Sequence, residues 1–441
     1  MSANTEWLQR SLASVWHPCT QMKHHPTLPL VPVARAEGVW LEDFEGKRYL
    51  DGISSWWVNL FGHGNPRINA AITDQLSKLE HVMLAGFTHQ PAIELAERLS
   101  AKTGGVLGHA FFASDGASAT EIALKMSFHA WQNAGLTEKR EFVCLEGSYH
   151  GETVGALSVT DIALFRDAYA PLVRNEHVHL APSPDARLAA PGETAEAVAN
   201  RAADALEALF VARAGKIAAM IIEPLVQCAT GMAMHHPQYL KRVRALCDAH
   251  GAHLICDEIA VGFGRTGTFF AHEQAGIRPD LLCLSKGITG GYLPLSVVLS
   301  TDAIYQAFWD DDVRRGFLHS HSYTGNPLAC RAALATLDIF DTDHVLEQNR
   351  QLSAFITAAL QPLANHPSVN HFRNTGMIWA MDVDNPHADF SRRYFAAAMA
   401  RGILVRPIGK TVYLMPPYVL NEIDAQWLSE QMLAALNATL A

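Results

Sequence analysis

The stretch "ICDEIAVGFGRTG", Ile255 to Gly267, follows a short apolar run and decides between two folds. Three glycines, Gly262, Gly264 and Gly267, have the G-x-G-x-x-G spacing of a dinucleotide-binding loop. The acidic pair that begins at Asp257 precedes them and indicates a different cofactor. The residues around this stretch are needed to choose between the two.

A dinucleotide-binding loop must open a helix, whose N-terminus holds the pyrophosphate. Here only "TFFAHEQAGIRPD" separates Gly267 from the next apolar run, and Gly276 and Pro279 interrupt it. The spacing therefore favours a glycine-rich turn at the carboxyl end of a strand. An NAD-dependent dehydrogenase remains the alternative that the glycine motif alone would support.

The composition is that of a folded chain with two domains. With 441 residues, the chain exceeds the size at which one core usually stops growing. Hydrophobic residues make up 49% and charged residues 18%, and the net charge of -10 offers no basic surface for nucleic acid. Neither a signal sequence nor a membrane span is expected. Seven scattered cysteines suggest free thiols in the cytoplasm, and no motif predicts a metal site.

Apolar runs alternate with amphipathic helical patterns in the middle of the chain, which predicts an α/β fold with a mostly parallel sheet. After about residue 330 the pattern changes to that of a smaller α+β domain. We expect a large domain over 60–330 and a small one formed by both termini, 1–59 and 331–441. The predicted strands are 142–145, 217–222, 253–256, 281–284 and 295–299, and the clearest helices are 119–131 and 237–250.

Two of these strands end at residues that suit pyridoxal phosphate. Asp257 follows one strand and Lys286 follows the next, so both can reach one crevice of the sheet. In pyridoxal phosphate enzymes a lysine bonds to the cofactor aldehyde, and a carboxylate keeps the pyridine nitrogen protonated. A buried Asp-Lys salt bridge explains the same spacing and stays open at this point.

Four motifs in order then carry a family resemblance: "IIEP" (221–224), "CDEIAVGFGRTG" (256–267), "PDLLCLSKGITGG" (279–291) and "TGNPLA" (324–329). Together they resemble the class III, or ω-aminotransferase, group of fold-type I pyridoxal phosphate enzymes, which are aspartate aminotransferase-like. The resemblance implies a seven-stranded sheet, Lys286 as the cofactor lysine and Asp257 as the partner of the ring nitrogen. It places Ile259 on one face of the ring and Tyr149 on the other. Glu121 and Glu223 are expected to be structural or to support the residues that touch the cofactor.

The phosphate of the cofactor has an expected site of its own. Gly116 and Ala117 open the helix at 119, where free N–H groups and the helix dipole attract an anion. In the resembled family, Ser322 or Thr324 reaches the same phosphate from a second subunit. The resemblance therefore implies a homodimer with shared active sites.

The flanking motifs "DGISSWWVNLFGHGNP" (51–66) and "VRPIGKTVYLMPPY" (405–418) narrow the resemblance to a subfamily that acts in biotin synthesis. It implies amino transfer from S-adenosylmethionine to 8-amino-7-oxononanoate. Arg406 would hold the substrate carboxylate, and Trp56, Trp57 and Tyr413 would line the pocket. A core position for the tryptophans and a surface salt bridge for Arg406 are the structural alternatives.

One departure concerns the amino donor. Cys19 stands where members of this subfamily can carry an aromatic residue, so the sequence leaves open whether the donor is S-adenosylmethionine or lysine. The role of Arg265 in the glycine turn is also open. A different ω-transaminase, which uses a diamine or a β-amino acid with pyruvate, is the nearest rival function, and a non-catalytic protein of the same fold is another.

Overall fold

The structure, a computed structural model of the chain, describes residues 2–26, 28, 30–385 and 387–441. The chain folds into two compact units. The larger unit is Arg67–Leu346, and the smaller one combines Met1–Pro66 with Glu347–Ala441. Both ends of the chain therefore contribute to the smaller unit.

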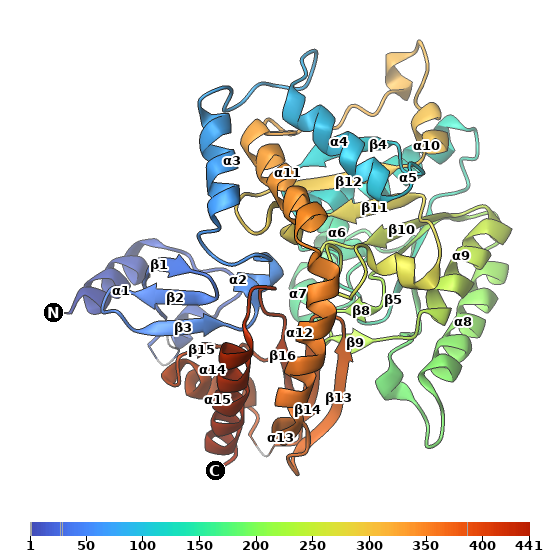
Figure 1. The fold of residues 1–441 in the computed structure, drawn as a ribbon. Coiled ribbons are helices and arrows are strands. Elements are labelled where there is room, and N and C mark those ends of the chain that lie inside the picture. Colours follow the sequence, from blue (N-terminus) through green and yellow to red (C-terminus); the bar gives the residue numbers. More distant parts are fainter. Residues whose placement is uncertain (1, 27, 29, 386) are drawn as a thin grey trace. The chain divides into compact units, whose positions relative to one another are not determined.

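A seven-stranded sheet forms the centre of the larger unit, in the order β4-β12-β11-β10-β7-β5-β6 (Figure 1). Only β12 runs antiparallel to its neighbours in this sheet. The expectation of a seven-stranded, mostly parallel sheet is thus confirmed. The strands are β4 (His109–Ala113), β5 (Glu141–Leu145), β6 (Val178–Ala181), β7 (Ile217–Ile222), β10 (His253–Asp257), β11 (Leu281–Leu284) and β12 (Ser296–Ser300), with a separate pair β8 (Val226–Gln227) and β9 (Ala233–Met234).

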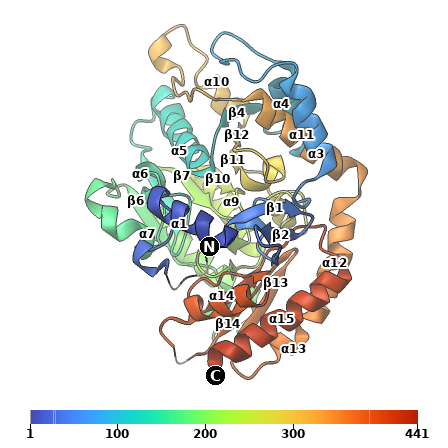
Figure 2. The ribbon, with the colours of Figure 1, turned by 90° about the vertical axis from the view of Figure 1, so that its left-hand side faces the viewer.

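Helices pack on both faces of this sheet (Figure 2), which explains why its central strands are mostly apolar. Every residue of β7 and of β11 is buried. On one face, α5 buries Ala119, Ile122 and Ala123 against the sheet. The helices of this unit are α3 (Pro66–Leu76), α4 (Gln90–Lys102), α5 (Gly116–Asn133), α6 (Val154–Ser158), α7 (Ala163–Arg166), α8 (Ala195–Ala212), α9 (Gln238–His250), α10 (Asp302–Gln306) and α11 (Pro327–Thr342).

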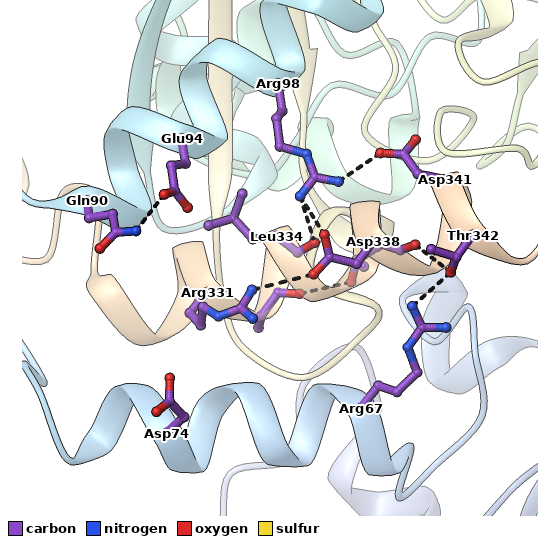
Figure 3. Close-up of polar contacts among 12 residues, drawn as sticks. Arg67, Asp74, Gln90, Glu94, Arg98, Arg331, Leu334, Asp338, Asp341 and Thr342 are labelled. Atoms are coloured by element: carbon purple, nitrogen blue, oxygen red, sulfur yellow. Dashed lines mark hydrogen bonds and ion pairs between the residues drawn. The ribbon is translucent and has the colours of Figure 1, made fainter.

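Helix α11 belongs to the larger unit, whereas the sequence analysis gave residues from 331 onward to the smaller domain. Its outer face carries carboxylates that pair with arginines of neighbouring helices (Figure 3). Arg98 of α4 contacts Asp338 at 2.7 Å and Asp341 at 2.8 Å. Arg67 donates to Asp343 just beyond the helix, at 2.8 Å. The boundaries therefore fall after Pro66 and Leu346 instead of 59 and 330.

The smaller unit holds two further sheets, β1-β2-β3-β15 and β13-β14-β16. It is the α+β unit that the sequence predicts, and its strands are short. The elements are β1 (Val33–Glu37), β2 (Trp40–Asp43), β3 (Arg48–Asp51), β13 (Val369–Thr375), β14 (Ile378–Val383), β15 (Ile403–Leu404), β16 (Thr411–Leu414), α1 (Ala3–Ser14), α2 (Ser54–Trp57), α12 (Val345–Ala359), α13 (Gln361–Ala364), α14 (Phe390–Ala400) and α15 (Glu422–Leu440).

Across the described part of the chain, no helix combines the length and the apolar character that crossing a membrane requires.

Candidate active site

Two neighbouring parallel strands bring Asp257 and Lys286 to the same edge of the large sheet. Asp257 is the last residue of β10 and pairs in register with Cys283 of β11. Lys286 begins the short 3-10 helix Lys286–Thr289 that follows β11. Its φ of 46° lies in the left-handed region, a strain that proteins keep mainly at functional positions.

The environment of Lys286 favours a neutral amine. Burial lowers the pKa of Lys286, and the nearby acidic groups Cys228, Asp257 and Glu223 only partly oppose this shift. A neutral amine is nucleophilic and can accept a proton.

His150 holds the Asp257 carboxylate in place, and the sequence analysis did not assign it a role. Its Nδ1 lies 2.7 Å from Asp257 Oδ2, and both side chains are buried. The other carboxylate oxygen, Oδ1, accepts the backbone N–H of Ile259 at 3.1 Å. Within the described residues, His150 Nε2 has no hydrogen-bond partner, so a proton on Nδ1 suits the pair best.

The turn that carries His150 also fixes Tyr149. The Tyr149 backbone N–H donates to Glu223 Oε2 at 3.1 Å, and its hydroxyl donates to Glu152 Oε1 at 2.9 Å. Its ring meets that of Phe165 edge-on at 5.5 Å. Tyr149 is thus fixed both at its backbone N–H and at its hydroxyl. Glu152, which binds the hydroxyl, is a second residue that could not be identified from the sequence.

Glu223 belongs to the buried cluster of Asp257 and Lys286. Besides Tyr149, it binds the backbone N–H of Cys228 through Oε1 at 3.2 Å. Burial raises the pKa of Glu223 to about 7, and the nearby Asp257 adds to the shift. The cluster therefore contains a carboxyl group that titrates near neutral pH.

The start of α5 fits the phosphate end of a bound cofactor. Helix α5 begins at Gly116 with Asp115 as its cap, and the first N–H groups of a helix have no acceptor within the helix. A side chain at Gly116 would come 2.9 Å from the Ile259 side chain, so only glycine leaves this space open. A Cβ at Gly151 would lie 2.6 Å from that of Ala117. The cradle, the carboxylate and the buried lysine together fit pyridoxal phosphate.

The two other predicted phosphate ligands, Ser322 and Thr324, belong to the loop that precedes α11. Ser322 is exposed, and the Thr324 hydroxyl donates to the His321 carbonyl of its own loop at 2.8 Å. His89, the cap of α4, fixes this loop through a 2.7 Å contact of its Nε2 with the Gly325 carbonyl. The expected contribution of this loop to a second subunit stays a prediction.

The glycine motif forms a turn, as the sequence analysis favoured. Gly264 and Gly267 have φ angles of 86° and 103°, which suit glycine. The following helical piece is the 3-10 helix Ala271–Ala275, so the glycines do not open an α-helix. Arg265 is 1% exposed within the turn, which places it in the interior rather than on the surface.

Within the smaller unit, the four predicted substrate residues lie in contact as two pairs. The Trp57 indole N–H donates to the Tyr413 hydroxyl at 3.1 Å, and both residues are buried. Trp56 is 45% exposed and has the Arg406 guanidinium 5.4 Å from its ring centroid. Arg406 also donates to the carbonyl of Cys19 at 3.0 Å, a contact that does not depend on the Cys19 side chain.

An apolar cavity of about 330 Å³ lies beside Arg406 in the same unit. Arg406 and Thr20 are among its polar lining residues, and its apolar wall includes Leu30, Leu404 and Phe395. A cation next to an apolar wall suits a ligand with both a negative end and a hydrocarbon chain.

Residues 20–436 match the family described as Aminotransferase class-III, and the chain belongs to this family. It is 44% identical to the adenosylmethionine-8-amino-7-oxononanoate aminotransferase of Helicobacter pylori, over 94% of each chain. It is 40% identical to the enzyme of the same name from Anoxybacillus flavithermus, over 95% of this chain and 93% of that one. The chain is therefore related over nearly its full length to aminotransferases that share one name.

Solved structures show the same fold. The adenosylmethionine-8-amino-7-oxononanoate aminotransferase of Methanocaldococcus jannaschii superposes with a TM-score of 0.91 at 32% identity, over 98% of this chain and 99% of that one. An (S)-enantioselective omega-transaminase from Thermomicrobium roseum superposes with a TM-score of 0.93 at 32% identity, over 99% of both chains. These matches confirm fold-type I and show that the fold alone does not select the substrate.

Proposed function

We propose that this protein is a pyridoxal phosphate-dependent aminotransferase that converts 8-amino-7-oxononanoate into 7,8-diaminononanoate in biotin synthesis, with S-adenosylmethionine as amino donor. The observation that carries the reaction type is the buried Lys286 beside an Asp257 held by His150. The choice of substrates is supported by the relatives named for this reaction, which match the chain over nearly its whole length.

The residues of the larger unit would hold the cofactor at three points. The N-terminus of α5 at Gly116 and Ala117 would bind the phosphate, Asp257 would accept a hydrogen bond from the ring nitrogen, and Ile259 and Tyr149 would cover the two faces of the ring. When bound, pyridoxal phosphate supplies an aldehyde that carries the amino group and a ring that accepts an electron pair.

Lys286 moves the proton of the reaction. With the donor amine bound in its place, Nζ would be a free amine, and burial, which lowers the pKa of Lys286, favours the neutral form that can accept a proton. In the first half of the reaction Nζ would take the proton from the donor carbon and deliver it to the C4′ carbon of the cofactor; in the second half it would move a proton from C4′ to the reacting carbon of the oxo acid. His150 keeps the Asp257 carboxylate oriented throughout, because it fixes Oδ2 at 2.7 Å.

The smaller unit would select the substrate. Arg406 is suited to bind the single carboxylate of the oxo acid, and guanidinium groups bind carboxylates with two parallel hydrogen bonds. Apolar residues beside it suit the methylene chain. The exposed ring of Trp56 offers a face for the sulfonium of S-adenosylmethionine.

We further propose a cytoplasmic homodimer in which Ser322 and Thr324 serve the active site of the partner chain. The exposed position of Ser322, away from the core of its own chain, supports this role. Six cysteines are buried and all seven are free, which is typical of proteins from a reducing compartment.

Product analysis tests the proposal and its nearest rival together. Purified enzyme with pyridoxal phosphate is incubated with the oxo acid and one donor at a time: S-adenosylmethionine, lysine, or a simple amine. A parallel reaction offers the amine with pyruvate, since an omega-transaminase has a similarly close structure. Diamine formed with S-adenosylmethionine supports the proposal. Diamine formed only with lysine would show that the amino donor is lysine instead of S-adenosylmethionine. Turnover of pyruvate without any diamine would replace the proposal with the omega-transaminase.

A further inference from the structure

Four consecutive residues of the smaller unit, Ser54–Trp57, adopt a left-handed turn although none of them is glycine. Their φ angles are 51°, 46°, 73° and 73°. Side chains of L-residues clash with the backbone in this region, so each such residue raises the energy of the turn. A strained segment of this length persists only where its surroundings hold it.

The carboxylate of Asp51, the last residue of β3, holds the middle of the turn. Its Oδ1 accepts the Ser55 backbone N–H at 2.9 Å, and its Oδ2 accepts the Ser55 hydroxyl at 2.6 Å. Asp51 is completely buried, and these contacts compensate for the cost of burying its charge. The turn is also tied at its start, where the Ser54 hydroxyl donates to the Met415 carbonyl at 2.8 Å.

His63 supports Asp51 from the other side. Its Nε2 lies 3.1 Å from Asp51 Oδ2, and its Nδ1 lies 3.2 Å from the side-chain nitrogen of Asn59. Because the Asn59 nitrogen is a donor and the carboxylate an acceptor, both contacts are satisfied when the ring carries its proton on Nε2. One tautomer of His63 therefore completes the set of donors around Asp51.

The left-handed turn sets the directions in which the side chains of Trp56 and Trp57 point. Trp57 is 5% exposed and bonded to Tyr413, whereas Trp56 is 45% exposed and faces Arg406. In a right-handed or extended segment these neighbouring side chains would leave the backbone in other directions. The position of Trp56 over Arg406 thus depends on the strained backbone.

We propose that Asp51 and His63 are positioning residues for substrate selection: they hold the left-handed turn that keeps Trp56 against Arg406. This inference rests on the proposed function, in which Arg406 binds the carboxylate of the oxo acid. Neither residue needs to touch the substrate, because both act through the backbone of Ser54–Trp57.

The test combines Asp51→Asn with two substitutions at Ser55. Asparagine keeps the shape of Asp51 but replaces one acceptor oxygen with a donor. Ser55→Gly and Ser55→Ala both delete the hydroxyl, yet only glycine accepts a positive φ without strain. In the Asp51→Asn background, glycine should therefore restore the turn and alanine should not. His63→Leu, which removes both ring nitrogens, checks the second positioning residue.

Two readouts are compared for each holoenzyme. Hydrogen exchange by mass spectrometry follows the peptide that contains Ser54–Trp57, and steady-state kinetics give KM for the oxo acid and kcat. Asp51→Asn should speed exchange and raise this KM about fivefold or more, with little change in kcat or in cofactor affinity. His63→Leu should act in the same direction, and Asp51→Asn/Ser55→Gly should recover most of both effects.

Unchanged exchange in Asp51→Asn would overturn the proposal, because the turn would then be held without it. Faster exchange with an unchanged KM would also overturn it, since the turn would not position a substrate group. Equal behaviour of the glycine and alanine double variants would show that backbone strain is not the reason. If the wild type forms no diamine with any donor, the proposed function fails, and the exchange data alone then decide whether Asp51 holds the turn.

Discussion

Replacing His150 with leucine should weaken the binding of pyridoxal phosphate and slow turnover. The His150 side chain is completely buried and its Nδ1 contacts Asp257 Oδ2 at 2.7 Å, so leucine removes one of the donors that stabilise this carboxylate. The carboxylate then loses a contact that orients Oδ2, so it is less well placed to pair with a protonated ring nitrogen. Hydrogen bonds to charged groups contribute about 1.5–3 kcal/mol, which corresponds to a roughly 10- to 100-fold rise in the cofactor Kd.

The assay is a titration of the cofactor-free protein with pyridoxal phosphate, followed by absorbance and by tryptophan fluorescence. His150→Asn is the conservative variant, because its amide nitrogen occupies about the place of Nδ1 and can still donate to Asp257. It should bind the cofactor nearly as the wild type does. His179→Leu is the matched control, since His179 Nε2 pairs with Glu141 at 3.0 Å elsewhere in the same unit.

A wild-type Kd and kcat in His150→Leu, with a melting temperature that falls like that of His179→Leu, would refute the role of His150 in cofactor binding. The pair would then serve stability alone. A loss of cofactor affinity in His179→Leu of the same size would also refute it, because the effect would not be local to Asp257.

Three further predictions concern Lys286, Arg406 and Glu223. Lys286→Ala should abolish turnover, and borohydride reduction of the wild type followed by peptide mapping should label the peptide that contains Lys286; a label at another lysine would contradict the assignment. Arg406→Lys should raise KM for the oxo acid about 10-fold or more with a smaller change in kcat, because lysine cannot form the two parallel hydrogen bonds; an unchanged KM would exclude the carboxylate role. Burial raises the pKa of Glu223 from an ordinary 4.5 to about 7, so the folded state binds the proton of this carboxyl group more tightly than the unfolded state does. The resulting contribution to the free energy of unfolding is complete below pH 4.5 and is lost as the pH rises through 7. The shift corresponds to roughly 3 kcal/mol, so the melting temperature of Glu223→Gln should fall less than that of the wild type between pH 5 and 8, and parallel pH profiles would contradict this.

Much of the large unit could be predicted from local patterns. Its strands are short apolar runs because a parallel sheet is covered on both faces, and the burial of β7 and β11 confirms this reason. Asp257 and Lys286 could be paired from the sequence because the carboxyl ends of neighbouring parallel strands meet at one edge. The absence of room for a helix after Gly267 likewise predicted the turn that the structure contains.

Contacts between segments that are distant along the chain could not be predicted from the sequence. Nothing near His150 indicates that its ring meets Asp257, and the expected domain boundary at 330 missed the ion pairs between α4 and α11. The left-handed turn at Ser54–Trp57 was also hidden, because serine and tryptophan carry no preference for a positive φ.

By itself, then, the sequence determined the α/β class, the strand ends and the lysine and aspartate at them, because periodicity and strand direction act over a few residues. Only the tertiary structure decided which side chains support those groups: His150 and Glu223 around Asp257 and Lys286, and Asp51 and His63 around the tryptophan turn. The physical reason is that a buried charge must find its donors wherever packing brings them, and packing joins residues whose separation along the chain is arbitrary.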